Sequence, residues 1–476
     1  MKIEFSTRTQ HKIEHYCIMD SAEDSKMVTA ADVFLSRRVP HPGDDNLMDK
    51  FPLDLIEKLR ENGLPFANLI FGDPHDKPIP EFARILALQG SRGLEENCSP
   101  KSFQYEWMYK NEAQAILSSL QRRRGDVYSR LTVDDVFVTN SAFGGLMMSM
   151  KTFSNVGDIF VTMAPEYFAY QPMIDGLECT RINVPLSESN DFALDVPKLE
   201  HTLLNTPKAR ILLLTSPNNP SGQMYDAEEL QELATALHHV NKIRKQTHGL
   251  PPIIMISDEA YHRIIFPSTG RKYVSPAEFY EYTLSVYSYA KTCMAPSERL
   301  GWLALSPLWP DNTRHMTRNA LIAARLSSGW LSPSVTNARC IPQLEEGDGV
   351  CVDMVKLQER RDKLVQACQQ VFPQVITPSS GFYMLVRYPD NFYHPDRGLA
   401  FVNMMGYRYR ILVLDGAFMG TPGWFRVSFT ASDDMIDLAV SGIQKFATEY
   451  KAQEHELQRW IHGEVENTDK YTEDTT

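Results

Sequence analysis

Three short polar segments in the middle of the sequence carry residue types that could do chemistry together. Segment 216–222 reads SPNNPSG, segment 257–261 reads SDEAY, and segment 288–291 reads SYAK, with Arg299 eight residues after the lysine. A lysine amine can hold a carbonyl compound as an imine, and the same amine is a base once it is displaced. A carboxylate such as Asp258 raises the pKa of a nearby ring nitrogen. An arginine binds the oxygens of an anion through a planar fork of donors.

Each segment also has an ordinary reading when it is taken alone. The sequence Asn-Pro-Ser-Gly is common in turns, an Asp-Glu pair after a strand is a common helix N-cap, and a single lysine in a loop is usually a solvated charge. However, the three segments follow successive predicted strands. In open parallel sheets, ligands bind beyond the carboxyl ends of the strands. We therefore expect the three segments to form one site.

Seven short apolar runs predict the strands that position this site, because they are rich in β-branched residues and alternate with segments of helical periodicity. These runs are 136–139, 159–162, 181–184, 211–215, 253–257, 284–287 and 302–305. Between them, residues 226–240 place three leucines on one helix face, and the basic segment 242–252 is predicted to be a surface loop. The alternation predicts the α/β class, with a mostly parallel seven-stranded sheet covered by helices on both faces.

The order of elements changes after Pro310, where predicted helices at 312–327 and 354–372 precede predicted strands at 382–387, 411–414 and 425–429. This order indicates a smaller α+β domain, which a helix at 53–62 could join. We expect the following division: an N-terminal arm at 1–50, the first part of the small domain with an active-site segment at 51–130, a large domain at 131–310, the rest of the small domain at 311–452, and an acidic, disordered tail at 453–476.

The first predicted strand is followed by TNSAFGG at 139–145, a turn of small residues that opens a predicted helix at 146–152. Backbone N–H groups at the start of a helix can bind a phosphate. Taken alone this is a weak signal, because many turns between a strand and a helix contain glycine.

Taken together, these motifs resemble the class I/II aminotransferases, an aspartate aminotransferase-like family of fold-type I enzymes that use pyridoxal 5'-phosphate (PLP). The resemblance covers about residues 66–429, and it rests on N-P-[ST]-G, D-E-x-Y and S-x-x-K with an arginine eight residues later. It implies that Lys291 is the Schiff-base lysine and that Asp258 faces the pyridinium nitrogen. Asn219 and Tyr261 would bind the phenolic oxygen of the cofactor, and Lys291, Asp258 and Tyr261 would be the catalytic residues.

The same resemblance implies the rest of the cofactor site and a substrate site. Ser288 and Arg299 would hold the cofactor phosphate, together with the backbone N–H groups of Ala142 and Phe143. Tyr167, in PEY at 165–167, corresponds to the aromatic residue that stacks on the cofactor ring. The residues expected to contact the substrate are Gly72 in FGDP, Asn219, and Arg426 in FRVSF, whose guanidinium would bind the α-carboxylate.

Three departures from the family pattern concern the edges of this site. The segment 108–113 reads MYKNEA where the family has G-Y-x-x-L-R. The tyrosine that reaches a partner subunit's phosphate falls on Phe103, which has no hydroxyl, although Tyr105 is a nearby substitute. The turn at 140–145 lacks the family's polar side chains, so we expect its phosphate contacts to come from the backbone alone.

The implied function is an aminotransferase that moves an amino group between an L-amino acid and a 2-oxo acid by a ping-pong mechanism through Lys291. A lyase, decarboxylase, cyclase or oxidase on the same scaffold shares all of these residues and stays open as an alternative. A remote alternative is a PLP-binding regulator, but residues 1–50 are too short for a DNA-binding domain and carry no basic patch. The resemblance also implies a homodimer with shared active sites. The substrate side chain stays open, with Arg325 and Arg339 in the general region of a second carboxylate.

Composition and charge exclude several other classes. The 476 residues are 43% hydrophobic, and 48 Lys and Arg against 60 Asp and Glu give a net charge of -12, which opposes binding to nucleic acid or anionic lipid. No apolar run reaches the length of a membrane span. Seven cysteines without a C-x-x-C pair indicate reduced thiols and a cytoplasmic protein.

Other chemistry-bearing residues receive ordinary interpretations. We expect no metal site, because the adjacent His238 and His239 have no third ligand at metal spacing. Cys293 is interpreted as a packing residue. The basic run Arg122-Arg123-Arg124 is interpreted as a helix end that is favourable to the helix dipole, without a further role.

Overall fold

A seven-stranded sheet forms the larger part of the protein in the computed structural model, which describes residues 53–96, 98–99, 104–106, 108–389 and 398–461, with side chains up to 450. The strand order is β2-β8-β7-β6-β5-β3-β4. β8 runs antiparallel to its neighbours β2 and β7, and the other neighbouring pairs are parallel. The strands are β2 (Val136–Asn140), β3 (Ile159–Ala164), β4 (Thr180–Pro185), β5 (Ala209–Thr215), β6 (Ile254–Asp258), β7 (Thr283–Ser288) and β8 (Leu300–Leu305). All seven predicted strands are present, and the predicted fold class is confirmed.

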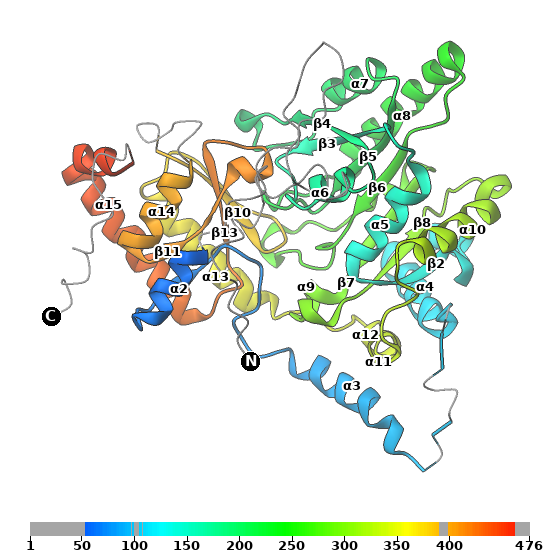
Figure 1. Cartoon of the computed structure of the whole chain (residues 1–476), viewed down its shortest axis with the longest axis horizontal. Coiled ribbons are helices and arrows are strands. Elements are labelled where there is room, and N and C mark those ends of the chain that lie inside the picture. Colours follow the sequence, from blue (N-terminus) through cyan, green and yellow to red (C-terminus); the bar gives the residue numbers. More distant parts are fainter. Residues whose placement is uncertain (1–52, 97, 100–103, 107, 390–397, 462–476) are drawn as a thin grey trace, which may run out of the picture.

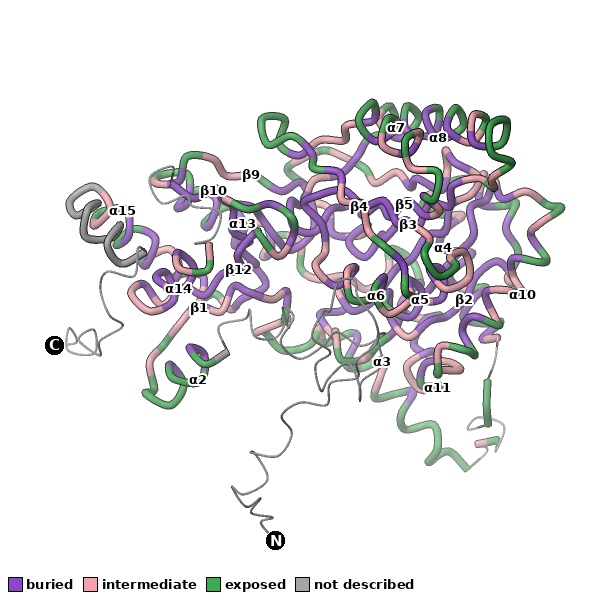
Figure 2. The backbone as a smooth tube through the Cα atoms, turned by 45° about the horizontal axis from the view of Figure 1, so that its top comes forward, coloured by how far each residue is buried: buried purple, intermediate pink, exposed green. Residues whose placement is uncertain are grey.

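Both faces of this sheet are buried under helices, as Figures 1 and 2 show. Successive residues of a strand point to opposite faces, so Ile211 and Leu213 of β5 join the core beneath α5 (Ser141–Phe153) and α10 (Asp311–Ser327). Leu212 and Leu214 join the core beneath α7 (Val196–Leu204) and α8 (Ala227–His248). α4 (Lys110–Arg124) contributes Ala113, Ile116 and Leu117 to a third core, which reaches β2, β7 and β8.

The smaller part contains an antiparallel sheet of order β12-β13-β10-β9. Its strands are β9 (Val375–Ile376), β10 (Tyr383–Arg387), β12 (Leu414–Asp415) and β13 (Trp424–Ser428). A separate two-stranded parallel sheet pairs β1 (Ala67–Asn68) with β11 (Ile411–Leu412). The helices of this part are α2 (Leu53–Glu61), α13 (Met354–Gln369), α14 (Gly398–Tyr409) and α15 (Asp433–Ile461). The smaller part is therefore built from both ends of the described chain.

The helix α2 packs in this smaller part, as the sequence suggested. Its apolar face, with Leu55, Ile56 and Leu59, forms a cluster with Leu412 and Leu414. The single strand expected at 411–414 is two strands, because β11 pairs with β1 while β12 pairs with β13. One apolar run thus serves two sheets.

The predicted surface loop at 242–252 is wrong for most of its length. α8 continues to His248 and ends at Gly249, which has a left-handed φ of 63°. Arg244 is buried in this last part of α8 and donates hydrogen bonds to the backbone carbonyls of Thr206, Pro207 and Ala209. The prediction failed because lysine, arginine and glutamine are good helix formers. The first residue that ends a helix is Gly249.

The ends of the chain differ from expectation where they are described. α15 runs to Ile461, so residues 453–461 of the expected disordered tail are helical. The sequence signal was misleading because a charged segment can continue an existing helix without burying apolar surface. Residues 462–476 and the expected arm at 1–50 lie outside the described residues. Within the described part of the chain, no helix combines the length and apolarity that crossing a membrane requires.

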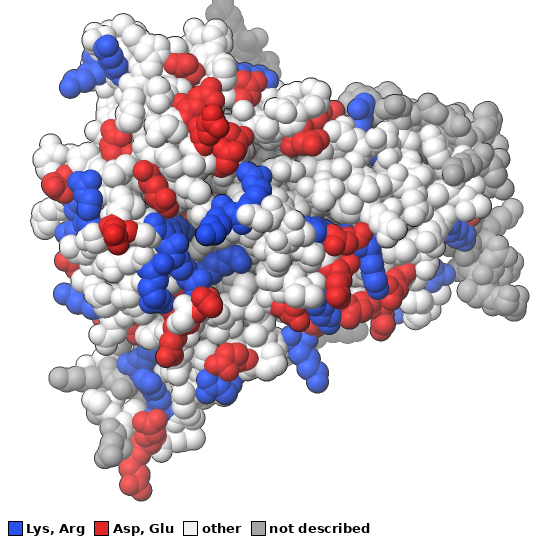
Figure 3. All heavy atoms as spheres, turned by 180° about the vertical axis from the view of Figure 1, so that it is seen from behind, with Lys and Arg blue, Asp and Glu red and all other residues white. Residues whose placement is uncertain are grey.

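The surface seen from behind carries charges of both signs. Lys and Arg side chains gather near the middle of this face, and Asp and Glu side chains lie next to them on several sides (Figure 3).

Candidate active site

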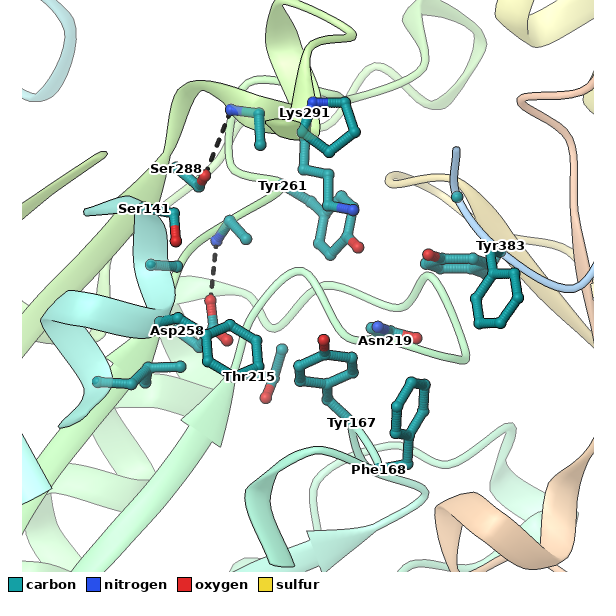
Figure 4. A pocket seen from close by; sticks show the side chains of 18 of the residues that line it. Ser141, Tyr167, Phe168, Thr215, Asn219, Asp258, Tyr261, Ser288, Lys291 and Tyr383 are labelled. Carbon is teal, nitrogen blue, oxygen red and sulfur yellow. Dashed lines mark hydrogen bonds between the residues drawn. The ribbon is translucent and has the colours of Figure 1, made fainter. Parts of the chain in front are cut away.

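A pocket lies at the carboxyl ends of β2, β5, β6 and β7 and is closed on one side by the smaller part. The structure brings all of the predicted site residues to this pocket, whose lining includes Gly72, Ala142, Phe143, Tyr167, Asn219, Asp258, Tyr261, Ser288, Lys291, Arg299 and Arg426. Figure 4 shows several of them, among them Asp258, Ser288 and Lys291, converging from separate strand ends. This follows from the parallel sheet, in which the polar segments after successive strands must meet at one edge.

Lys291 lies on the short helix α9 (Tyr289–Thr292), which begins directly after β7. Ser288 is the N-cap of this helix, and its Oγ accepts a hydrogen bond from the N–H of Ala290 at 3.3 Å. The Lys291 side chain extends beside Tyr261 (Figure 4), with Nζ 5.8 Å from the centre of the Tyr261 ring. The cap and the strand end thus fix where the lysine amine enters the pocket.

Asp258 ends β6 and is buried at the bottom of the pocket. Its Oδ1 accepts a hydrogen bond from the N–H of Ala260 at 3.2 Å, and its Oδ2 accepts one from the hydroxyl of Tyr170 at 2.8 Å. Burial raises the pKa of this carboxyl to about 6, although the hydrogen bond from Tyr170 acts in the opposite direction. A buried carboxylate of this kind has a strong need for a cation.

The anion-binding end of the pocket is built from Ser141, Ser288 and Arg299. Arg299 donates a hydrogen bond from Nη2 to Ser141 Oγ at 2.5 Å, and the Ser141 hydroxyl lines the pocket. The backbone N–H groups that follow, at the start of α5, can donate to an anion. A Cβ at Gly301 would lie 2.3 Å from the carbonyl oxygen of Tyr287 and 2.7 Å from the carbonyl carbon of Ser141, so a glycine is needed there.

Ser141 adds a side chain to the backbone groups that the sequence led us to expect from this turn. Its hydroxyl is one of the groups that point toward the pocket (Figure 4). The sequence pointed to backbone contacts alone because segment 140–145 replaces a more polar turn of the family. A serine at the first position of α5 supplies a hydroxyl at the same end of the pocket.

Arg426 lies on β13 and is 1% exposed at the other end of the pocket. Its Nη1 donates to Asn219 Oδ1 at 3.1 Å, and its Nη2 donates to the carbonyl oxygen of Ile70 at 2.6 Å. The guanidinium carbon lies 4.1 Å from the centre of the Tyr383 ring. A Cβ at Gly72 would lie 2.4 Å from Tyr383 Oη, which explains why a glycine stands there. These contacts fix the plane of the guanidinium.

Tyr383 was not predicted from the sequence, yet it joins the two halves of the pocket. Burial acts to raise the pKa of Tyr383, but Lys291, Arg426 and hydrogen bonds from Tyr261 and Gly72 outweigh it, so the pKa is lowered. The pKa of Tyr261, by contrast, is raised by burial. The Tyr383 hydroxyl is thus the more acidic of the two phenols next to the lysine.

Tyr170, Thr215 and Phe168 were also missed. The hydroxyl of Tyr170 lies 2.7 Å from Thr215 Oγ1 and donates a hydrogen bond to Asp258. The ring of Tyr167 lies 4.9 Å from that of Phe168 and 6.2 Å from that of Phe143 between ring centres. Tyrosine, threonine and phenylalanine are common core residues, so no spacing in the sequence distinguished them from packing. The one available signal was the position of Thr215 at a predicted strand end.

Several other candidates do not belong to the pocket. Arg325 is buried within α10, and Arg339 lines a separate hollow beside Tyr109, so neither lines the pocket. Phe103 lies outside the described residues, and Tyr105 is 83% exposed and away from the pocket lining of this chain. Within the described residues there is no cluster of possible metal ligands.

Comparison with known proteins identifies the family. A family model described as aminotransferase class I and II matches residues 109–443, which is more than half of the chain. The chain belongs to this family. Among the aminotransferases that it resembles, the bifunctional aspartate aminotransferase and glutamate/aspartate-prephenate aminotransferase of Petunia hybrida is 27% identical over 409 residues, covering 82% of this chain and 78% of the relative.

A second aminotransferase, the aromatic-amino-acid aminotransferase 2 of Thermococcus litoralis, is 24% identical over 326 residues, covering 66% of this chain and 77% of the relative. A solved amino transferase from Eubacterium rectale has a TM-score of 0.73 and 22% identity, covering 86% of this chain and 96% of that one. These matches confirm that the protein is an enzyme with aminotransferase function and that its fold is that of fold-type I aminotransferases.

Proposed function

We propose that this aminotransferase uses pyridoxal 5'-phosphate to move an amino group between an L-amino acid and a 2-oxo acid. The observation that carries this proposal is the composition of one pocket, which combines a lysine amine, a buried carboxylate, and two arginines at opposite ends. One arginine suits the cofactor phosphate and the other suits a substrate carboxylate.

The donor set of the pocket fits this cofactor group by group. Lys291 would hold its aldehyde, and Asp258 would face its ring nitrogen, which would supply a cation next to this buried carboxylate. Arg299, Ser141, Ser288 and the first N–H groups of α5 would bind its phosphate. When bound, PLP supplies an aldehyde for the amine of the substrate and a protonated ring that accepts the electrons of the broken bond.

The other steps belong to residues of this chain. Arg426 binds the α-carboxylate of the amino acid and so selects which bond at Cα breaks. The Lys291 amine, once the substrate amine has displaced it, accepts the proton from Cα and delivers it again further along the reaction. Tyr261 and Tyr383 are neighbours of this amine, and their hydroxyls can donate hydrogen bonds to an oxygen of the cofactor or substrate. The buried aromatic side chains keep water from the exchange.

The decisive experiment is a Lys291→Ala variant of the purified enzyme. We expect the variant to lose the visible absorbance of the bound cofactor and at least 10³-fold of its transamination rate, because no other lysine lines the pocket within the described residues. Full turnover by this variant would contradict the proposal. Asp348→Asn, an exposed surface change, is a matched control that should leave both readouts unchanged.

An assay with and without a 2-oxo acid acceptor distinguishes transamination from the alternative reactions on this scaffold. A lyase, decarboxylase, cyclase or oxidase would turn over an amino acid without a 2-oxo acid, whereas a transaminase stops after one turnover. We expect sustained product only when both substrates are present, measured by mass spectrometry over a panel of amino acids.

We also propose that the substrate side chain is apolar or aromatic. The cations that line the described pocket are Lys291, Arg299 and Arg426, and each has its own role in the proposal. Phe71, Phe143, Tyr167, Phe168 and Tyr383 supply aromatic surface instead. In the same panel, kcat/KM should be at least tenfold higher for phenylalanine than for aspartate, and the reverse order would contradict this part of the proposal.

Three further proposals concern the assembly, the location and the domain division. A homodimer is supported by two large apolar side chains that lie exposed after α3 (Pro80–Ser91), Leu94 and Tyr105. A cytoplasmic location is supported by the described cysteines, all of which are free thiols. We also propose that the large domain begins after residue 130 and ends at residue 310.

A further inference from the structure

A buried ion pair lies beneath the loop that carries Asp258 and Tyr261. Arg124, the last residue of α4, donates from Nη2 to Glu259 Oε2 at 2.6 Å, and the two side chains are 5% and 0% exposed. The other carboxylate oxygen, Oε1, accepts a hydrogen bond from Ser275 Oγ at 2.6 Å. Both oxygens of Glu259 are thus held by groups from other parts of the chain.

The backbone of Glu259 is held as firmly as its side chain. Its N–H donates to the carbonyl oxygen of Val286 in β7 at 2.8 Å, and its carbonyl oxygen accepts from the N–H of His262 at 3.0 Å. Asp258 precedes this residue directly, and Tyr261 follows it by two. Displacing Glu259 would therefore move both of these pocket residues relative to β7, which leads to Lys291.

Three aromatic rings surround the guanidinium of Arg124. Its guanidinium carbon lies 5.2 Å from the ring centre of Tyr273, 5.6 Å from that of Tyr128 and 6.0 Å from that of Trp302. These rings favour a cation and exclude water. Without Arg124, Glu259 would be a buried charge that has lost its paired cation, which is strongly unfavourable.

This contact corrects the interpretation of the run Arg122-Arg123-Arg124 as a helix end without a further role. Three adjacent arginines point in different directions from a helix, and the sequence does not show which one turns inward. Arg123 donates to Ser119 Oγ and to the carbonyl oxygen of Gly347 and does not contact Glu259. Arg124 alone of the three pairs with a side chain in the loop of Asp258.

We propose that Arg124 is a positioning residue of the cofactor site, which acts through Glu259 to hold Asp258 and Tyr261 in the pocket. The inference rests on the proposed function, because it takes Asp258 and Tyr261 to be cofactor contacts. Arg124 itself does not line the pocket. It acts on the cofactor only through the loop that it anchors.

The test compares Arg124→Met with the matched control Arg123→Met. Each variant is stripped of cofactor and titrated with PLP, and its melting temperature, kcat and KM are measured. We expect Arg124→Met to weaken PLP binding about tenfold, in the range found for outer groups that orient ligating residues, and to lower kcat more than it changes KM. Arg123→Met should bind PLP like the wild type. Equal PLP binding by both variants and the wild type would overturn the proposal.

The double variant Arg124→Met/Glu259→Gln separates positioning from stability. Removing both charges should restore much of the melting temperature, because no buried charge is left unpaired. PLP binding should stay weak, since methionine and glutamine form no charge-assisted anchor for the loop. If PLP affinity recovers together with the melting temperature, the pair is structural only and the proposal is wrong.

Ser275→Ala provides a milder variant if Arg124→Met does not fold. It removes one hydrogen bond to Glu259 Oε1 and leaves the ion pair in place, so we expect PLP binding to weaken about threefold. Unchanged PLP binding by this variant would overturn the proposal. A wild-type protein that binds no PLP would overturn the proposed function and this inference together, whereas a binding wild type with a normal Arg124→Met would overturn the inference alone.

Discussion

The Asp258 carboxyl shows how a single residue is poised for a bound cation. Its oxygens have a hydroxyl and a backbone N–H as partners, but its burial still favours the neutral form and raises its pKa to about 6. A cationic ring nitrogen at this place would reverse that balance. The charged form of Asp258 therefore lowers the folding stability of the protein without cofactor, and a bound cation would remove this cost. Cofactor affinity and folding stability are linked in this way.

This electrostatic cost predicts the effect of Asp258→Asn on the cofactor-free protein. Because the folded pKa lies above the unfolded value of 3.8, the stability contribution of the acid is fully present below pH 3.8 and is lost as the pH rises through 6. We expect the variant to be more stable than the wild type at pH 8, by up to about 3 kcal/mol, and this gain to shrink toward pH 4. Urea denaturation at both pH values measures it, with Asp348→Asn as the control. A gain independent of pH would contradict the prediction.

Several of the site residues that the sequence predicted combine a residue type with distinctive chemistry and a place at a strand end. Lys291 and Asp258 were recognisable for that reason. Tyr383, Tyr170 and Ser141 were not, because their types are common in cores and turns and their roles arise from contacts across the chain. Arg124 was misread for the same reason, since the direction of a side chain on a helix is set by packing.

At the scale of elements, the strands were predictable because buried parallel strands are short, apolar and bounded by polar turns. The ends of the elements were harder to predict. The end of α8 was placed too early because a basic segment suits either an exposed helix or a loop. The tertiary contact that decides between them is Arg244, which reaches back to the segment before β5.

Arg244→Met tests this contact of α8. The substitution removes the donor for three backbone carbonyls, two of which are held at 2.7 and 3.1 Å. We expect a loss of about 1 to 3 kcal/mol in the free energy of unfolding, since the buried carbonyl oxygen of Ala209 loses this donor. Lys245→Met changes the adjacent, exposed residue of the same helix and should cost less than about 0.5 kcal/mol. Equal effects of the two variants would show that the contact contributes little.

At the scale of the whole molecule, the pocket depends on both parts of the chain. The larger part contributes Lys291, Asp258 and Arg299, and the smaller part contributes Arg426 and Tyr383. The hydrogen bond from Arg426 to Asn219 crosses between them. The substrate end of the pocket therefore exists only when the two parts are in contact.

The proposed homodimer makes a prediction at this same scale. The mass in solution should be twice the 54.3 kDa of the chain, measured by light scattering. If Tyr105 completes the phosphate site of a partner, Tyr105→Ala should weaken PLP binding about tenfold without changing that mass, because it removes a hydroxyl near the phosphate. Val156→Ala, at another exposed apolar residue, is the control. A monomeric mass would contradict the proposal.

The pairing of β1 with β11 has a consequence for the order in which a ribosome releases the chain. Residues 67–68 must wait for residues 411–412 before they can pair, whereas the last strand of the large sheet ends at Leu305. Lys291, Asp258 and Arg299 therefore emerge with the last strands of this sheet, and Arg426 and Tyr383 emerge later. During synthesis, the strands that carry the lysine and the buried carboxylate are therefore complete before the residues of the substrate end have emerged.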